Sequence, residues 1–267
     1  SSESPSMVLK RLLAGIGFGG ASVETSLASP VTTPGGSLRG TVVIEAGDVE
    51  QRVEQLTVGL QARVETEIGD HEVNSDMEFH RVRLGDAVVL SPGQRFQVPF
   101  DLFVPWETPI TVHRGRHLHP MRLGVNTRLH VAGAVDPGDL DPVAVEPLPS
   151  QAAVLDSLFS LGFTFKHADL ERGRINRTRQ RLPFYQEIEF RSPRRYRGLE
   201  ELELSMVTDE HGMDVVLELD KKPGLLFSEG RDTYHRFSVG HAEGAGRDWS
   251  GHLHQWIDSL AGRRGLF

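Results

Sequence analysis

The sequence predicts an all-β protein made of two β-sandwich domains. Short segments of alternating apolar and polar residues, separated by turns rich in proline and glycine, are typical of strands that bury one face. The chain has 267 residues, which is long for one sandwich and comfortable for two domains of ordinary size. The proline-containing segment from Glu146 to Ser150 reads as a stiff linker. We therefore place an N-terminal sandwich at residues 7–145 and a C-terminal sandwich with a closing helix at 151–267.

The first domain is expected to start with a short helix and to continue in strands. Met7 to Ile16 carries an apolar face and is followed by glycines that end a helix. Turn clusters then separate three segments of strand character: Thr41 to Glu45, Leu56 to Val64, and Met77 to Leu84.

The stretch from Pro92 to Pro149 adds two more alternating strands. Their apolar positions are Phe96, Val98, Phe100, Leu102 and Val104 in the first strand, and Val125, Leu129 and Val131 in the second. Pro99 and Pro105 have no N–H to donate to a ladder, so we expect them at a sheet edge or a strand end. The total approaches about seven strands, the number expected of a sandwich.

The second domain is expected to begin with a helix and then return to strands. Val154 to Leu161 has helical apolar spacing, and Gly162 is placed to stop that helix. Strand segments resume at Phe163, Tyr185 to Phe190, Leu199 to Thr208, and Met213 to Leu219, the last two joined as a hairpin by a turn at 211–212.

A closing helix is predicted from Asp248 onward. Its apolar stripe consists of Trp249, Leu253, Trp256, Ile257 and Leu260. We expect this stripe to dock on the second domain rather than on a membrane, since few residues of its polar face are basic.

Composition narrows the functional classes. The chain has 29 basic and 37 acidic residues, a formal charge of −8, so general affinity for nucleic acid is not expected. It contains no cysteine, which excludes disulfides, thiolate zinc sites and cysteine nucleophiles. Without a long apolar run or a signal-peptide pattern, a cytoplasmic location is the expectation.

Several turns and strands occur in an order and spacing that resemble a known family. They are Val23 to Thr25, Ile44 to Gln51, Thr108 to Thr111, Ala134 to Asp139, Leu155 to Phe163, Phe184 to Phe190, and Met213 to Lys222. Taken together they resemble the bacterial sporulation-control proteins of the stage-zero M family. The resemblance implies an arrestin-like arrangement of the two sandwiches and a role in regulating developmental commitment. It brings no catalytic motif with it.

Two groups of side chains have residue types that can bind a metal ion. His117 and His119 would share one face of a strand, as zinc ligands do, but arginines surround them. The segment from Asp136 to Asp141 has oxygen ligands suited to calcium, but its prolines and glycine are ordinary turn chemistry. We expect exposed histidines and a turn, and no metal or cofactor, with zinc and calcium as the alternatives.

An arginine-rich segment is the main candidate for a partner-binding or anion-binding site. Nine arginines lie between Arg172 and Arg197, opposed by two glutamates. The candidate residues are Arg172, Arg174, Arg177, Arg179, Arg181, Arg195 and Arg197. Guanidinium groups bind carboxylate and phosphate in a bidentate manner, and we expect Arg174, Arg177 and Arg179 to form the centre of the surface. A solvated strand face is the plainer alternative.

No catalytic template is present, so we do not expect an enzyme. The sequence and the resemblance together favour a cytoplasmic adaptor or scaffold that regulates sporulation, development or cell division through a protein partner, with homo-oligomerisation left open. The alternative is a module that binds anionic lipid or a phospho-ligand through the same arginines and the terminal helix.

Overall fold

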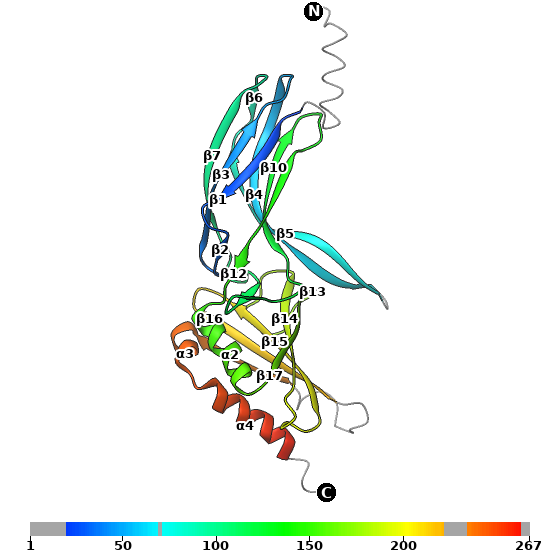
Figure 1. The fold of residues 1–267 in the computed structure, drawn as a ribbon, viewed down its shortest axis with the longest axis vertical. Helices are drawn as coiled ribbons and strands as arrows, with labels where there is room; N and C mark the ends of the chain where they lie inside the picture. Colours follow the sequence, from blue (N-terminus) through cyan, green and yellow to red (C-terminus); the bar gives the residue numbers. More distant parts are fainter. Residues whose placement is uncertain (1–19, 69–70, 222–233, 263–267) are drawn as a thin grey trace, which may run out of the picture.

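The computed structural model describes residues 20–68, 71–221 and 234–262. They form two halves stacked along the long axis of the molecule (Figure 1). The expected helix at Met7 to Ile16 lies outside the described residues. Strands predominate, which confirms the all-β class. No helix in the described ranges is both long and apolar enough to cross a membrane.

The first half is a sandwich of two sheets. One sheet has the order β1-β3-β7, with β1 at Ser22–Leu27, β3 at Ser37–Glu45 and β7 at Arg95–Phe103. The facing sheet contains β4 (Gln51–Ile68), β5 (His71–Gly85), β6 (Val88–Leu90), β10 (Leu123–Val131) and β11 (Gly138–Pro142). Short strands complete this half: β2 (Val31–Thr32), β8 (Val112–His113), β9 (Arg116–His117) and β12 (Ala144–Val145).

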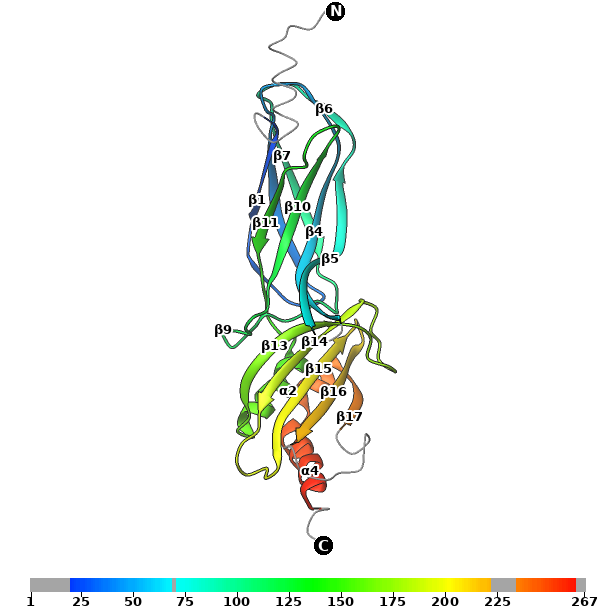
Figure 2. The ribbon, with the colours of Figure 1, turned by 90° about the vertical axis from the view of Figure 1, so that its right-hand side faces the viewer.

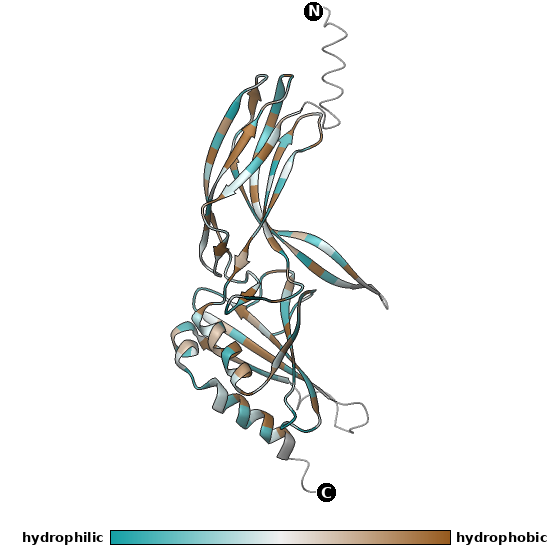
Figure 3. Cartoon of the chain, viewed as in Figure 1, coloured by the Kyte–Doolittle hydropathy of each residue, from teal (hydrophilic) through white to brown (hydrophobic). Residues whose placement is uncertain are grey.

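The alternation that predicted these strands is visible in the packing. Apolar and polar residues alternate along the ribbons (Figure 3), and Val42, Val58 and Leu129 are fully buried between the sheets. Pro99 lies in β7, which ends its sheet, and Pro105 follows the end of that strand, as expected from their missing N–H groups.

The β4–β5 hairpin is longer than the sequence predicted. Alternation indicated Leu56 to Val64, whereas β4 continues to Ile68 and projects with β5 beyond the sandwich (Figure 1). Glu65, Thr66 and Glu67 after Val64 are polar, and Ile68 is a single apolar position next to the turn, so the apolar alternation does not extend this far. Backbone pairing within the hairpin extends the strand there.

The second half has one described sheet. It consists of β13 (Thr164–Arg172), β14 (Phe184–Arg191), β15 (Leu199–Thr208), β16 (Gly212–Lys221) and β17 (Tyr234–Gly240), all antiparallel. Helices α2 (Pro149–Ser160), α3 (His241–Gly246) and α4 (Trp249–Gly262) lie on one face of it (Figure 1). Among the described residues, helices therefore form the layer where a C-terminal sandwich would place its second sheet.

The helices supply the apolar surface that this layer needs. Leu158 of α2 and Leu253 of α4 are both fully buried, and Trp249 at the start of α4 is 1% exposed. The predicted docking of the closing helix on its own domain is confirmed. Pro149 and Ser150, expected in a linker, instead form the first turn of α2, where proline is well suited because its missing N–H needs no partner.

Polar contacts join the two halves. A single parallel bridge between Glu65 and Glu171 connects β4 to β13, so one ten-stranded sheet continues through both halves (Figure 2). The Gln186 side chain accepts from the Ile110 N–H at 3.1 Å and donates to the Ile110 carbonyl at 2.7 Å. Thr208 also donates to the Trp106 carbonyl. The junction is thus fixed by hydrogen bonds to backbone groups.

Candidate functional site

The arginine-rich segment divides between two loops. Antiparallel hairpins place the loop before β14 and the loop after it at opposite ends of that strand. β14 has eight residues, so its ends lie about 25 Å apart at a rise of about 3.3 Å per residue. Residues 173–183 lie beside the junction, whereas Arg195 and Arg197 lie at the far end of the sheet.

Four of the candidate arginines share the loop beside the junction. Arg172, Arg174, Arg177 and Arg181 are exposed, and within the described ranges none of them has an ion-pair partner. We call residues 172–181 the arginine loop.

The buried side chain of Gln180, which is 8% exposed, stabilises the conformation of the arginine loop. Its amide nitrogen donates to the carbonyls of Gly173, Leu182 and Phe184 at 2.8–3.0 Å, and its oxygen accepts from the Ile175 N–H at 2.8 Å. These hydrogen bonds from one side chain fix the backbone of the loop, so the exposed arginines project from a preformed structure.

A second clamp comes from Arg236 on β17. Its Nη1 donates to the carbonyls of Asn176 and Arg177, both at 2.9 Å. Arg177 has a φ of 61°, a left-handed conformation that a non-glycine residue adopts at a cost. Sequence reasoning missed Arg236, because this residue lies about sixty positions away along the chain and nothing in its own strand distinguishes it.

Arg179 points inward, unlike its neighbours in the arginine loop. Its guanidinium lies 2.5 Å from a carboxylate oxygen of Asp209 and 3.3 Å from Asp214. The Asp214 side chain is 6% exposed and also accepts from Ser238 Oγ at 2.5 Å and from the Arg179 N–H at 2.6 Å. Burial raises the pKa of Asp214, but these hydrogen bonds more than offset that effect and lower it overall. Arg179 therefore anchors the loop and does not form the centre of an exposed surface.

The two arginines at the far end of β14 have internal contacts. Nη2 of Arg195 donates to the Leu161 carbonyl at the end of α2, at 2.5 Å, and the guanidinium lies 4.9 Å from the centre of the Tyr196 ring. Arg197 likewise has an interaction within the chain. The structure does not bring this pair together with the arginine loop.

Next to the arginine loop, the sheet face that the helices leave open is acidic. Glu187, Glu203 and Glu218 line a small cavity of about 170 Å³ with Arg174 at its border. Burial, followed by repulsion from Glu203 and other carboxylates, raises the pKa of Glu187 to about 8. The arginines of the loop therefore lie at the edge of an acidic sheet face. This region has basic groups on one side and acidic groups on the other.

Both groups of possible metal ligands lie in the first half. Nδ1 of His117 lies 3.3 Å from Nδ1 of His119, and both rings are exposed. In the aspartate segment, Asp136 accepts from the Val131 N–H at 2.9 Å and Asp139 accepts from the Thr25 N–H at 2.7 Å. These carboxylates are used to fix a turn and its neighbouring strand.

The structure also brings together three carboxylates that the sequence did not connect. Oxygens of Glu65, Asp169 and Glu171 lie within 4.8 Å of one another, a spacing that could hold a cation. They meet because β4 and β13 pair at the junction.

The chain is similar to known proteins in both sequence and structure. A family model described as SpoOM protein (Spo0M) matches residues 9–223. The sporulation-control protein spo0M of Bacillus subtilis (strain 168) is 33% identical over 215 residues, which is 80% of each chain. The crystal structure of Spo0M from Bacillus subtilis superposes with a TM-score of 0.79 at 29% identity, over 91% of this chain and 100% of that one.

Proposed function

The chain belongs to the Spo0M family, and we propose that it is a non-catalytic regulator of sporulation or a related developmental process that binds a protein partner through the arginine loop. The observation that carries this proposal is the set of four exposed guanidinium groups on a loop fixed by Gln180 and Arg236. A preformed loop loses little conformational entropy when it binds, so more of the contact energy appears as affinity.

The chemistry of the loop favours an acidic segment of a protein as the partner. Arginine forks bind carboxylates with two parallel hydrogen bonds, which fixes orientation as well as charge. The chain as a whole carries a charge of −8, so an acidic partner is repelled by most of the surface and directed to the arginine loop.

The lipid-binding alternative is less favoured because the described apolar side chains of α4 pack against the protein and leave little apolar surface for a membrane. Trp249 is 1% exposed, and the Trp256 ring stacks on His235 with 4.9 Å between ring centres. The arginine loop alone could still attract an anionic surface, so vesicles belong in the test. The cytoplasmic location and homo-oligomerisation remain predictions.

In-cell crosslinking followed by affinity capture and mass spectrometry tests the proposal. The loop variant is Arg172/Arg174/Arg177/Arg181→Gln. A matched control removes four charges from exposed arginines that also lack ion pairs in the described structure: Arg116, Arg128, Arg191 and Arg194.

We expect a partner that the parent chain and the control capture and that the loop variant loses. Equal capture by all three chains would refute the role of the loop. Salt-sensitive binding of the purified parent to anionic vesicles, lost in the loop variant and without a captured protein, would instead support the lipid alternative.

A further inference from the structure

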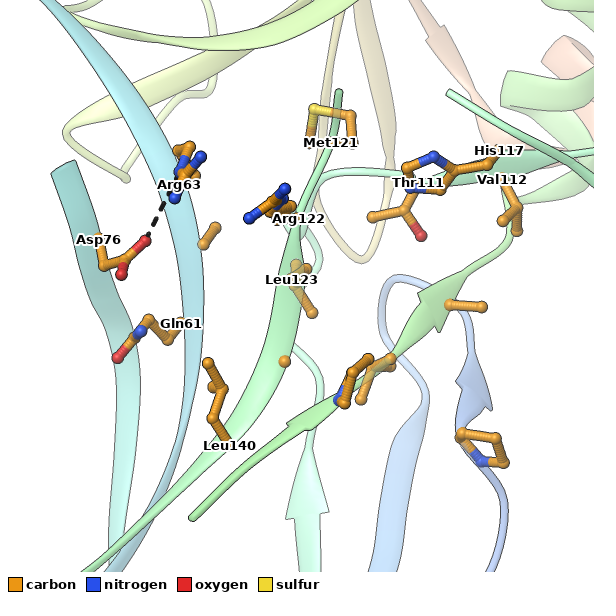
Figure 4. A pocket seen from close by; sticks show the side chains of 16 residues that line it. Gln61, Arg63, Asp76, Thr111, Val112, His117, Met121, Arg122, Leu123 and Leu140 are labelled. Atoms are coloured by element: carbon orange, nitrogen blue, oxygen red, sulfur yellow. Dashed lines mark ion pairs between the residues drawn. The ribbon is translucent and has the colours of Figure 1, made fainter. Parts of the chain in front are cut away.

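The first half contains a cavity of about 630 Å³ near the junction (Figure 4). Its walls come mainly from β4, β10, β11 and the segment at the start of β12, and Val112 of β8 and His117 of β9 also line it. Most of the lining is apolar, including Leu123, Leu140 and Val143. The volume is within the range of about 300–1,000 Å³ that is typical of small-molecule sites, which combine apolar walls with a few polar groups.

Two arginines stand at one end of this cavity. Arg63 on β4 and Arg122, just before β10, lie close together in Figure 4. Arg63 is 3.9 Å from an oxygen of Asp76, too far for a hydrogen bond, and its side chain is 42% exposed. Arg122 is exposed and has no ion pair within the part of the chain that the structure describes. Asp76 is the one carboxylate in the lining of this cavity, so Arg63, Arg122 and Asp76 together contribute one net positive charge to the lining.

Both arginines also border a second cavity, of about 380 Å³, on the side of the second half. That cavity contains carboxylates of Glu65, Asp169 and Glu189, so it does not suit an apolar chain or an anion. The larger cavity is therefore the one that fits a molecule with an apolar body and one anionic end placed at the arginines.

Several backbone N–H groups around the larger cavity already donate within the protein. The N–H of Arg63 donates to the Arg122 carbonyl at 3.2 Å, that of Val143 to the Leu123 carbonyl at 3.0 Å, and that of Ala144 to the Pro30 carbonyl at 2.8 Å. A bound peptide cannot pair with these N–H groups, and any of its own backbone groups placed against the apolar walls would lose water without finding partners. An aliphatic chain has no such groups to satisfy.

We propose that this cavity binds an aliphatic carboxylate, with its carboxylate at Arg63 and Arg122 and its chain against Leu123 and Val143. Guanidinium groups supply the two-pronged donors that a carboxylate accepts, and the apolar walls remove the chain from water. The site is separate from the arginine loop, and the proposal does not depend on the function assigned to that loop.

Calorimetric titration of the purified full chain with dodecanoate, below its micellar concentration, tests the proposal. The variants are Arg63/Arg122→Gln, which removes the cations, and Leu140→Asp, which changes a wall residue that is 53% exposed and so does not unfold the sandwich. Arg128→Gln on β10, another exposed arginine, is the matched control. Dodecylammonium and a short acidic peptide with apolar side chains serve as alternative ligands.

We expect one dodecanoate per chain, an affinity at least tenfold lower in Arg63/Arg122→Gln and in Leu140→Asp, and no change in Arg128→Gln. Dodecylammonium and the peptide should bind at least tenfold more weakly than dodecanoate. Absence of dodecanoate binding, equal affinity in the arginine variant, several molecules per chain, or tighter binding of either alternative ligand would overturn the proposal.

Discussion

Replacing Arg179 with methionine would show whether this arginine anchors the loop rather than faces a partner. The change removes the guanidinium and retains most of the apolar stem. Asp214, whose side chain is 6% exposed, would then lose its paired cation. Loss of one member of a buried ion pair costs about 3–5 kcal/mol.

The expected cost lies at or just below the lower limit of that range. Asp214 keeps hydrogen bonds from Ser238 Oγ and the backbone N–H of residue 179, and the Arg179 side chain is 22% exposed. We therefore expect the free energy of unfolding to fall by about 2–3 kcal/mol. The matched control, Arg177→Met, removes an exposed arginine without an ion pair in the described structure and should change stability by less than about 0.5 kcal/mol.

Urea unfolding at several pH values is the assay. The pKa values of Asp209 and Asp214 are lowered in the folded protein despite burial, which by itself raises them. Depressed carboxyl pKa values stabilise the folded state above the unfolded value of about 4, and this contribution is lost as the pH falls through the folded values. The difference between parent and Arg179→Met should thus shrink below about pH 4. Equal stability of the two methionine variants, or a difference that is unchanged at pH 3, would refute the anchoring role.

Three further substitutions test other parts of the structure. Because the pKa of Glu187 is raised to about 8, the folded state binds its proton more tightly than the unfolded state does. The free energy of unfolding of the parent should therefore fall as the pH rises from about 4 to 8, and with it the urea midpoint. Glu187→Gln should make the urea midpoint depend less on pH in this range; an unchanged dependence would contradict the raised pKa. Gln186→Leu leaves the N–H and carbonyl of Ile110 without their bonds and should cost about 1–3 kcal/mol in urea unfolding, whereas a neutral result would show that these bonds do not hold the junction. Leu253→Ala removes a fully buried side chain of α4 and should cost about 2–5 kcal/mol by thermal or urea unfolding; a smaller loss would indicate that the helix is only loosely docked.

The sequence predicted those elements whose pattern is local. Alternation from Leu199 to Thr208 predicted β15 with the bounds that the structure has, and the apolar stripe after Asp248 predicted α4. Gly162, with a φ of 86°, ends the preceding helix as its position indicated. In each case the residues that determine the element lie within a few positions of one another.

The candidate site was less predictable because its arrangement is not local. A run of arginines looks like one patch in the sequence, but β14 separates its two ends. The inward turn of Arg179 depends on Asp214, which is thirty-five residues away. The hydrogen bonds from Arg236 to the arginine loop, and the placement of Arg63 and Arg122 in the lining of one cavity, likewise depend on which strands become neighbours.

We propose that the chain regulates development through the arginine loop. The most direct measurement is complementation: the chain's own gene is deleted from its host, and sporulation or the corresponding developmental step is quantified after parent, loop variant or four-arginine control is restored at equal protein levels. We predict that the parent and the control restore normal development and that the Arg172/Arg174/Arg177/Arg181→Gln variant does not. Full restoration by the loop variant would contradict the claim.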